Sequence, residues 1–214
     1  MPLPPAFNRL AWSNLAAQSA EQVGLAAAPI VAVLTLGAGA GTTGMLQTAQ
    51  TLPFLLLAIP AGVLADRTSR RRLMTASEAL RGLSLGGILV LGAFGLLTLP
   101  LLAALGFLGA CGTVAYSVTA PALVPALVEP TALAAANGRL ELARTVAFAG
   151  GPALAGTLVG WTGGAPAFGV AAALSTCAVF LLAGLREPAR PRGRRTARSA
   201  RSARAPASSS VTGC

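Results

Sequence analysis

Histidine and lysine are both absent from this sequence of 214 residues, and charged residues of any kind make up only 10% of it. A soluble domain usually carries about a quarter charged residues. Hydrophobic residues instead reach 54%, and the mean hydropathy is +0.70. The shortage of charge therefore excludes an ordinary soluble domain and indicates a chain that lies in lipid.

Metal binding, disulfide formation and catalysis each need residues that are missing or unsuitably spaced in this sequence. Without histidine, and without cysteines at metal-ligand spacing, we expect no metal site. Two of the three cysteines, Cys111 and Cys177, fall inside apolar runs and the third, Cys214, is the last residue, which is not typical of a disulfide framework. No nucleophile, base and orienting group occur together, and no Walker motif or phosphate-binding glycine loop follows a strand. We therefore predict neither an enzyme nor a bound cofactor.

What the sequence does have is long apolar runs. A chain crosses a bilayer as helices or as a closed barrel, and the alternating ten-residue segments of a barrel are missing. A helix needs roughly 20 residues to cross the hydrocarbon. The sequence thus predicts an all-α membrane protein with six transmembrane helices in one bundle. The expected spans run over residues 14–36, 44–65, 73–97, 99–120, 140–160 and 166–185.

Arginine is distributed unevenly among the connections between these spans. The connections at residues 37–43, at Thr98 and at residues 161–165 carry no charge, whereas arginines precede the first span and follow the second, fourth and sixth. Basic residues accumulate on the cytoplasmic side of a membrane. We therefore expect a multi-pass protein of the cell (inner or plasma) membrane with both termini cytoplasmic. The expected parts are a cytoplasmic N-terminus (1–13), the bundle (14–185) and a disordered arginine-rich cytoplasmic tail (186–214).

Polar side chains inside the spans are the candidate functional residues. Asn14, Gln18 and Glu21 are spaced i, i+4, i+7 and share one face of the first span. At 1.5 Å per residue, Glu21 lies about 10 Å into the membrane, close to the expected level of Thr113. An ionisable group at that depth is costly and usually faces a cavity or a partner. Glu21 is therefore our candidate for proton coupling.

The remaining candidates for a substrate cavity lie on two other spans. They are Gln47, Gln50 and Thr51 in the second span and Thr113, Tyr116 and Ser117 in the fourth. The alternative is that these residues only form hydrogen bonds between helices, as polar residues in membrane bundles often do. Glu78 with Arg81, and Glu141 with Arg144, are three residues apart and are predicted to pair along their helices near the cytoplasmic side. Small residues one turn apart, Gly82 with Gly86 and Gly156 with Gly160, are expected at helix interfaces.

The arginine cluster after the second span resembles the signature loop of the major facilitator superfamily. The stretch GVLADRTSRRRL matches G-x-x-x-D-R-x-x-R-R in the loop where that family carries it, through Gly62, Asp66, Arg67, Arg70, Arg71 and Arg72. The resemblance implies that Asp66 joins the loop arginines and a helix end of a second bundle as a conformational latch. The alternative is that this cluster only anchors the loop on the cytoplasmic side.

A second motif lies in the fifth span. Gly151, Pro152 and Gly156 resemble the antiporter motif G-x-x-x-G-P-x-x-G-G, although Ala147 and Ala155 replace two of its glycines. The surrounding sequence is similar to bacterial drug and siderophore exporters such as those of enterobactin and macrolides. The fourth span lacks the arginine that many proton-coupled members carry there. The resemblance covers residues 7 to about 190, which corresponds to the amino-terminal half of a twelve-span transporter.

The resemblance implies a secondary active transporter, a proton-coupled exporter of drugs or siderophore-like small molecules, present as an amino-terminal half or a truncated form. Its expected partners are the lipid bilayer, a small-molecule substrate and either a second six-helix half or a second copy of itself. The basic tail is expected to contact lipid rather than nucleic acid, because it has no interleaved aromatic residues. The alternative function is a non-transporting membrane fragment or interaction subunit from a truncated or frameshifted gene.

Overall fold

The computed structural model describes residues 4–185, and within them it contains six long helices and one short 3-10 turn. Each helix is long and apolar enough to cross a membrane. The all-α, six-span fold is therefore confirmed, whereas the predicted disordered tail lies outside the described residues. The elements are α1 (Pro5–Leu34), α2 (Ala40–Arg67), α3 (Arg70–Ala93), α4 (Leu99–Leu127), η1 (Pro130–Ala132), α5 (Leu133–Thr162) and α6 (Gly164–Ala183).

Several helices extend past the expected ends of the spans. Helix α1 begins at Pro5 rather than at residue 14, and Phe7 and Leu10 in its added turns are fully buried. Helix α4 continues through Pro121 to Leu127, and α5 begins at Leu133 rather than at residue 140. Side chains packed against neighbouring helices stabilise these extra turns, so the helices are longer than the hydrocarbon requires.

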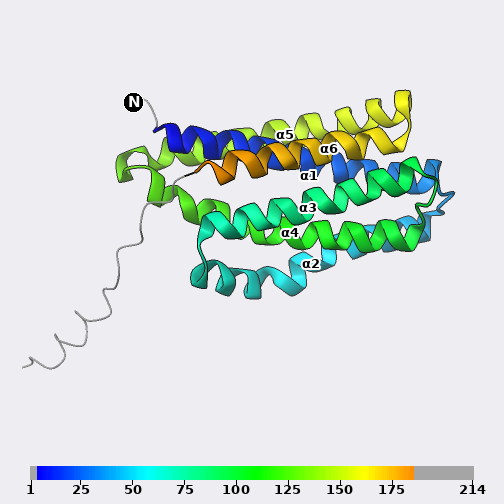
Figure 1. The fold of residues 1–214 in the computed structure, drawn as a ribbon, viewed down its shortest axis with the longest axis horizontal. Coiled ribbons are helices and arrows are strands. Elements are labelled where there is room, and N and C mark those ends of the chain that lie inside the picture. Colours follow the sequence, from blue (N-terminus) through cyan, green and yellow to red (C-terminus); the bar gives the residue numbers. More distant parts are fainter. Residues whose placement is uncertain (1–3, 186–214) are drawn as a thin grey trace, which may run out of the picture.

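The six helices divide into two groups of three (Figure 1). Helix α1 packs against α5 and α6, α4 packs against α2 and α3, and the α3–α6 contact joins the two groups. If α1, α2 and α3 are relabelled α4, α5 and α6, and the reverse, the same set of helix contacts results. Along the sequence, the bundle therefore consists of two equivalent units, α1–α3 and α4–α6. Helices α2 and α5 are its outer helices.

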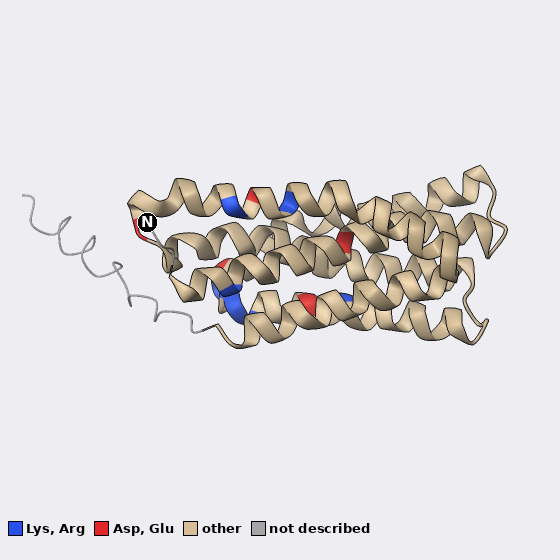
Figure 2. Ribbon diagram, turned by 90° about the horizontal axis from the view of Figure 1, so that it is seen from above, with Lys and Arg blue, Asp and Glu red and all other residues tan. Residues whose placement is uncertain are grey.

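The two ends of the bundle differ in charge. The α1–α2, α3–α4 and α5–α6 connections lie together at one end and carry no charged residue, and we call it the uncharged end. The start of α1, the α2–α3 loop and the end of α6 lie at the opposite end, where Figure 2 shows several of the arginines. We call this the arginine-bearing end.

A polar layer separates two apolar clusters in the core. One cluster, towards the uncharged end, contains Val31, Leu102 and Phe168, and the other, towards the arginine-bearing end, contains Phe7 and Leu182. Buried polar residues lie between them along the helices: Glu78, Arg81 and Ser84 on α3, Thr113 on α4 and Ser175 on α6. Burying these polar groups costs free energy unless each of them has a hydrogen-bond or ion-pair partner.

Close helix contacts depend on some of the glycines and not on others. A Cβ atom at Gly112 would lie 2.5 Å from the carbonyl oxygen of Ser77, so this glycine lets α4 approach α3. Gly82 faces Ser175 across the α3–α6 contact. The other expected interface glycines, Gly86, Gly156 and Gly160, have nothing near enough for a Cβ to meet. None of these three is therefore needed for a close helix contact within the described bundle: Gly156 and Gly160 are exposed, and Gly86 is half-buried with free space around it.

Candidate functional site

Arg81 is the centre of the polar layer. Its guanidinium is 4% exposed, and its Nη2 donates to both carboxylate oxygens of Glu78 at 2.6 Å. Nη2 also donates to the carbonyl oxygen of Ala17 at 2.7 Å, Nη1 donates to Thr113 at 3.2 Å and Nε donates to Ser175 at 3.3 Å. Arg81 thus connects α1, α3, α4 and α6 through hydrogen bonds.

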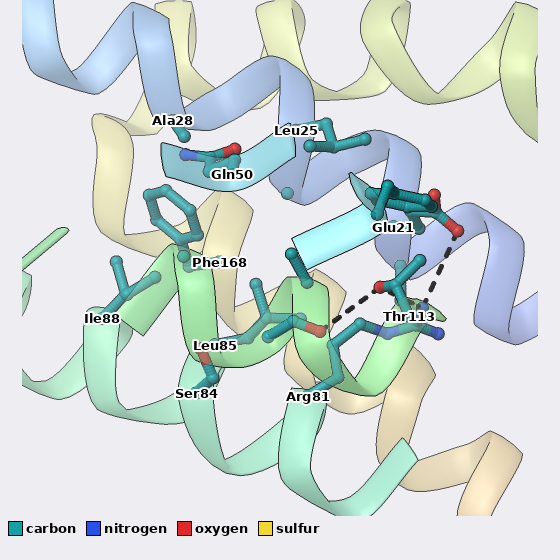
Figure 3. Close-up of a pocket in the computed structure, with 16 residues that line it drawn as sticks. Glu21, Leu25, Ala28, Gln50, Arg81, Ser84, Leu85, Ile88, Thr113 and Phe168 are labelled. Carbon is teal, nitrogen blue, oxygen red and sulfur yellow. Dashed lines mark hydrogen bonds and ion pairs between the residues drawn. The ribbon is translucent and has the colours of Figure 1, made fainter. Parts of the chain in front are cut away.

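A second carboxylate approaches the same guanidinium. The Oε2 atom of Glu21 lies 3.8 Å from Nη1 of Arg81, and the Glu21 side chain is 17% exposed (Figure 3). Glu78, by contrast, is fully buried. Two carboxylates therefore share one guanidinium, so with both ionised Glu21, Glu78 and Arg81 together carry a net negative charge, with Arg144 on the groove wall as the next cation that acts on Glu21. This arrangement can accept one proton or one cation.

Glu21 lies where two hollows of the bundle meet. On one side is a cavity of about 60 Å³ that Arg81, Thr113 and Gln50 also line (Figure 3). On the other side is a groove of about 670 Å³, walled by α1, α4 and α5 with Phe54 of α2. A groove of this volume can hold a drug-sized molecule. Glu21 therefore faces both the buried arginine and a space large enough for a ligand.

Half of the predicted cavity residues, four of eight, line this groove. Asn14 and Gln18 extend along α1 from Glu21, and Tyr116 and Ser117 lie opposite on α4. The amide of Asn14 also donates to the carbonyl oxygen of Leu140 at 3.3 Å, so it contributes to the α1–α5 contact. Glu141 and Arg144, which pair at 3.8 Å as predicted, form the α5 wall. The groove walls thus carry amides, hydroxyls and charges of both signs.

The hydroxyl of Tyr116 has no hydrogen-bond partner among the described residues, although the tyrosine is only 2% exposed. The hydroxyl of the nearby Ser13 donates to the carbonyl oxygen of Leu10 at 2.8 Å. A buried hydroxyl without a partner is costly.

The structure places one of the three residues predicted on the second span beside a cavity. Gln50 is buried and lines the small cavity, but Gln47 and Thr51 are exposed on the outside of α2. The hydroxyl of Thr51 donates to the carbonyl of Gln47 within its own helix. Because α2 packs mainly against α4, only a narrow strip of its surface is covered, and Gln47 and Thr51 lie outside that strip.

The sequence reasoning missed the central role of Arg81. It paired Arg81 with Glu78 near the end of the span, and the pair is confirmed, but both residues lie in the middle of the bundle. The available signal was depth, because Arg81 lies about three turns into α3, where a cation facing lipid would be costly. The contacts to Glu21 and Thr113 come from other helices, so spacing along α3 could not reveal them.

The arginines of the α2–α3 loop also bind within the bundle. Arg70 donates to the carbonyl oxygen of Ala122 on α4, and Arg71 donates to those of Ala183 and Leu185 at the end of α6, at 3.0 and 3.1 Å. Asp66, Arg67 and Arg72 are exposed at the same end, and Gly62 faces Val118 of α4. Besides any role in anchoring the chain at one side of the membrane, this segment therefore forms contacts with both α4 and α6.

In the fifth span the motif glycines have different surroundings. A Cβ atom at Gly151 would lie 2.4 Å from the Cβ of Gln22, so Gly151 lets α5 approach α1 closely. Pro152 and Gly156 are exposed on the side of α5 that the bundle leaves uncovered.

Comparison with known proteins decides the family. The family model described as "Transmembrane secretion effector", of the major facilitator superfamily, matches residues 6–204. The chain belongs to this transporter family. Its curated relatives include the multidrug efflux pump Tap of Mycobacterium bovis (strain BCG / Pasteur 1173P2) and of Mycobacterium tuberculosis (strain ATCC 25618 / H37Rv). Each is 31% identical over 206 residues, which cover 88% of this chain and 48% of the relative.

This member of the transmembrane secretion effector family spans about half the length of the curated relatives it matches. Transporters of the major facilitator superfamily contain two six-helix halves, each built from two inverted three-helix repeats. The contact pattern of the six helices, in which α1–α3 and α4–α6 are interchangeable, agrees with one such half. The resemblance inferred from the loop motif is therefore confirmed.

Proposed function

We propose that this chain is one bundle of a proton-coupled exporter of drug-like or siderophore-like small molecules, and that Glu21 binds the coupled proton. The observation that carries the proposal is the position of Glu21, between the Arg81 guanidinium and the open groove. Protonation of Glu21 removes the net negative charge of Glu21, Glu78 and Arg81. Loss of the proton restores that charge in a site that the groove connects to solvent.

The groove is the proposed substrate site. It offers the amides of Asn14 and Gln18, the hydroxyl of Ser117 and the ring of Phe54. Walls that combine apolar surface with amides, a hydroxyl and charged groups suit amphipathic molecules that carry hydrogen-bonding groups. In such a site, a substrate and a proton on Glu21 affect one another directly because they are neighbours.

Rocking transport requires a second bundle, which we propose is either a separate six-helix half or a second copy of this chain. The outer helices support this proposal, because large apolar side chains on them have no partner within the described bundle. Leu55 and Ile59 on α2 are 81% and 80% exposed, and Trp161 on α5 is 86% exposed. In the assembled transporter, we propose that Asp66 acts as the latch to the second bundle.

We further propose that the protein lies in the cell membrane with the arginine-bearing end in the cytoplasm. The positive-inside rule supports this orientation, since none of the connections at the opposite end contains a basic residue.

The proposal is tested by drug accumulation. Cells that lack their own exporters and express the chain should accumulate less of a fluorescent dye, such as ethidium, than cells without it. A Glu21→Gln variant removes the exchangeable proton with little change in shape, so it should accumulate as much dye as the empty cells. A Glu129→Gln variant is the matched control, because Glu129 is an exposed carboxylate in the α4–α5 connection, away from the groove. It should behave like the unchanged chain.

Equal accumulation in all of these cells, at equal amounts of protein in the membrane, would remove the transport proposal. The chain would then be the non-transporting membrane fragment or interaction subunit. Export that persists in the Glu21→Gln variant would retain transport but reject Glu21 as the proton site.

A further inference from the structure

A second groove lies on the outside of the bundle, remote from Glu21. It has a volume of about 700 Å³ and runs along α6 beside the start of α1 at the arginine-bearing end. Its lining consists of Arg9 from α1 and of Ala173, Thr176, Cys177, Phe180, Leu181 and Gly184 from α6 and its C-cap. The hydroxyl of Thr176 is already bonded to the carbonyl of Ala172, so the walls are effectively apolar and the one charge is at the end.

Two arginines converge on the end of α6. Arg9 donates to the carbonyl oxygen of Gly184 at 2.6 Å, and Arg71 donates to those of Ala183 and Leu185. The C-terminus of a helix carries about half a negative charge. Two guanidiniums more than neutralise it, and none of the residues that line the groove between positions 4 and 185 is acidic. A surplus of positive charge therefore remains where the groove opens at this end.

The length of the groove fits the depth of one leaflet. Ala173 and Gly184 are eleven positions apart in the sequence, which corresponds to about 16 Å along a helix. Half of the hydrocarbon core is about 15 Å thick. An apolar channel of this length, with a guanidinium at its end, matches the dimensions and charge of a single acyl chain attached to a phosphate group.

We propose that this groove, the α6 groove, binds one acidic phospholipid. The phosphate group lies against Arg9, whose Nη1 is bonded to Gly184, and the acyl chain runs along Phe180 and Cys177 towards Ala173. Zwitterionic phospholipids bind more weakly because their headgroups have no net charge to complement the arginines. Because the site is outside the bundle, the lipid remains bound whatever occupies the inner groove.

A tryptophan placed in the groove reports on its occupant. In a chain carrying Trp12→Phe and Trp161→Phe, Phe180→Trp introduces a single fluorophore at a groove residue that is 73% exposed. Reconstitution into mixtures with brominated phosphatidylglycerol or brominated phosphatidylcholine then measures which lipid lies beside it. We expect phosphatidylglycerol to be preferred about fivefold at this position. Arg9→Gln should abolish this preference, whereas Arg139→Gln, an exposed arginine on α5 outside the groove, should preserve it.

Two further measurements distinguish binding at the α6 groove from a general attraction of acidic lipid to the protein. Phe94→Trp in the same background places the fluorophore at the uncharged end, on a residue that is 76% exposed, and should show no preference between the lipids. Soluble glycerol phosphate should not displace the brominated lipid. Equal quenching at position 180 by both lipids, the same preference at position 94, or displacement by glycerol phosphate would each overturn the proposal.

Discussion

At the scale of single residues, the two carboxylates that share Arg81 have different access to solvent. Glu78 is fully buried and receives two hydrogen bonds from the guanidinium, whereas Glu21 is partly exposed and lies 3.8 Å from it. Glu78 is therefore the permanent counter-ion of Arg81. Glu21 is the carboxylate that we propose exchanges its proton.

Replacing Arg81 by methionine should destabilise the bundle, because Glu78 would lose its buried partner. Breaking a buried ion pair costs about 3–5 kcal/mol, whereas replacing both members with apolar residues is often close to neutral. We therefore expect Arg81→Met to lower the thermal unfolding midpoint in detergent, and Arg81→Met with Glu78→Leu to recover most of the loss. A double variant as unstable as the single one would mean that Arg81 acts through its other partners.

The sequence predicted the depth of two residues of this cluster but not the central position of Arg81. Counting residues from the ends of the spans placed Glu21 and Thr113 at one depth, and both residues now contact the same guanidinium. Arg81 itself was not singled out, because its partners on α1, α4 and α6 are distant in sequence. Depth follows from helix geometry, but which faces meet depends on how the helices are arranged.

At the scale of the elements, α5 approaches its neighbour at one glycine and leaves another uncovered. Gly151 touches Gln22 of α1, whereas Gly156, on the same helix, faces open space. Of these two motif glycines, Gly151 therefore serves packing within the bundle, whereas Gly156 lies on a surface that is free for contacts outside it.

Replacing Gly151 by valine should force α5 away from α1. Overpacking of this kind costs about 1–3 kcal/mol, so the variant should give less folded protein and a lower unfolding midpoint. Gly156→Val makes the same chemical change on the uncovered side and should leave both quantities unchanged in the isolated chain. The two are compared by fluorescence-detected size-exclusion chromatography after heating, and equal loss in both would contradict the assigned contact.

The helices themselves were more predictable than their faces. Uninterrupted apolar runs identified all six helices, because length and hydropathy alone satisfy the demands of a bilayer. The polar residues expected on α2 differ in burial, since Gln50 is buried whereas Gln47 and Thr51 lie outside the strip that α4 covers. A helix with one main neighbour buries fewer residues than periodicity suggests.

At the scale of the whole molecule, the proposed orientation predicts which connections can be reached from outside the cell. In a chain whose native cysteines are replaced, a cysteine at Gly39 in the α1–α2 connection should react with a membrane-impermeant maleimide added to intact cells. A cysteine at Thr131, an exposed residue of the α4–α5 connection, should react only after the membrane is permeabilised. The opposite pattern would reverse the orientation and place the arginine-bearing end outside.

The position of Glu21 has a consequence for the order of events in exchange. Its carboxylate forms part of the groove wall, so any molecule that fills the groove shields it from water. If Glu21 carries the coupled proton, as we propose, substrate and proton must bind in turn, because whichever binds first closes the route for the other. Such alternation would prevent protons from leaking across the membrane while substrate is bound.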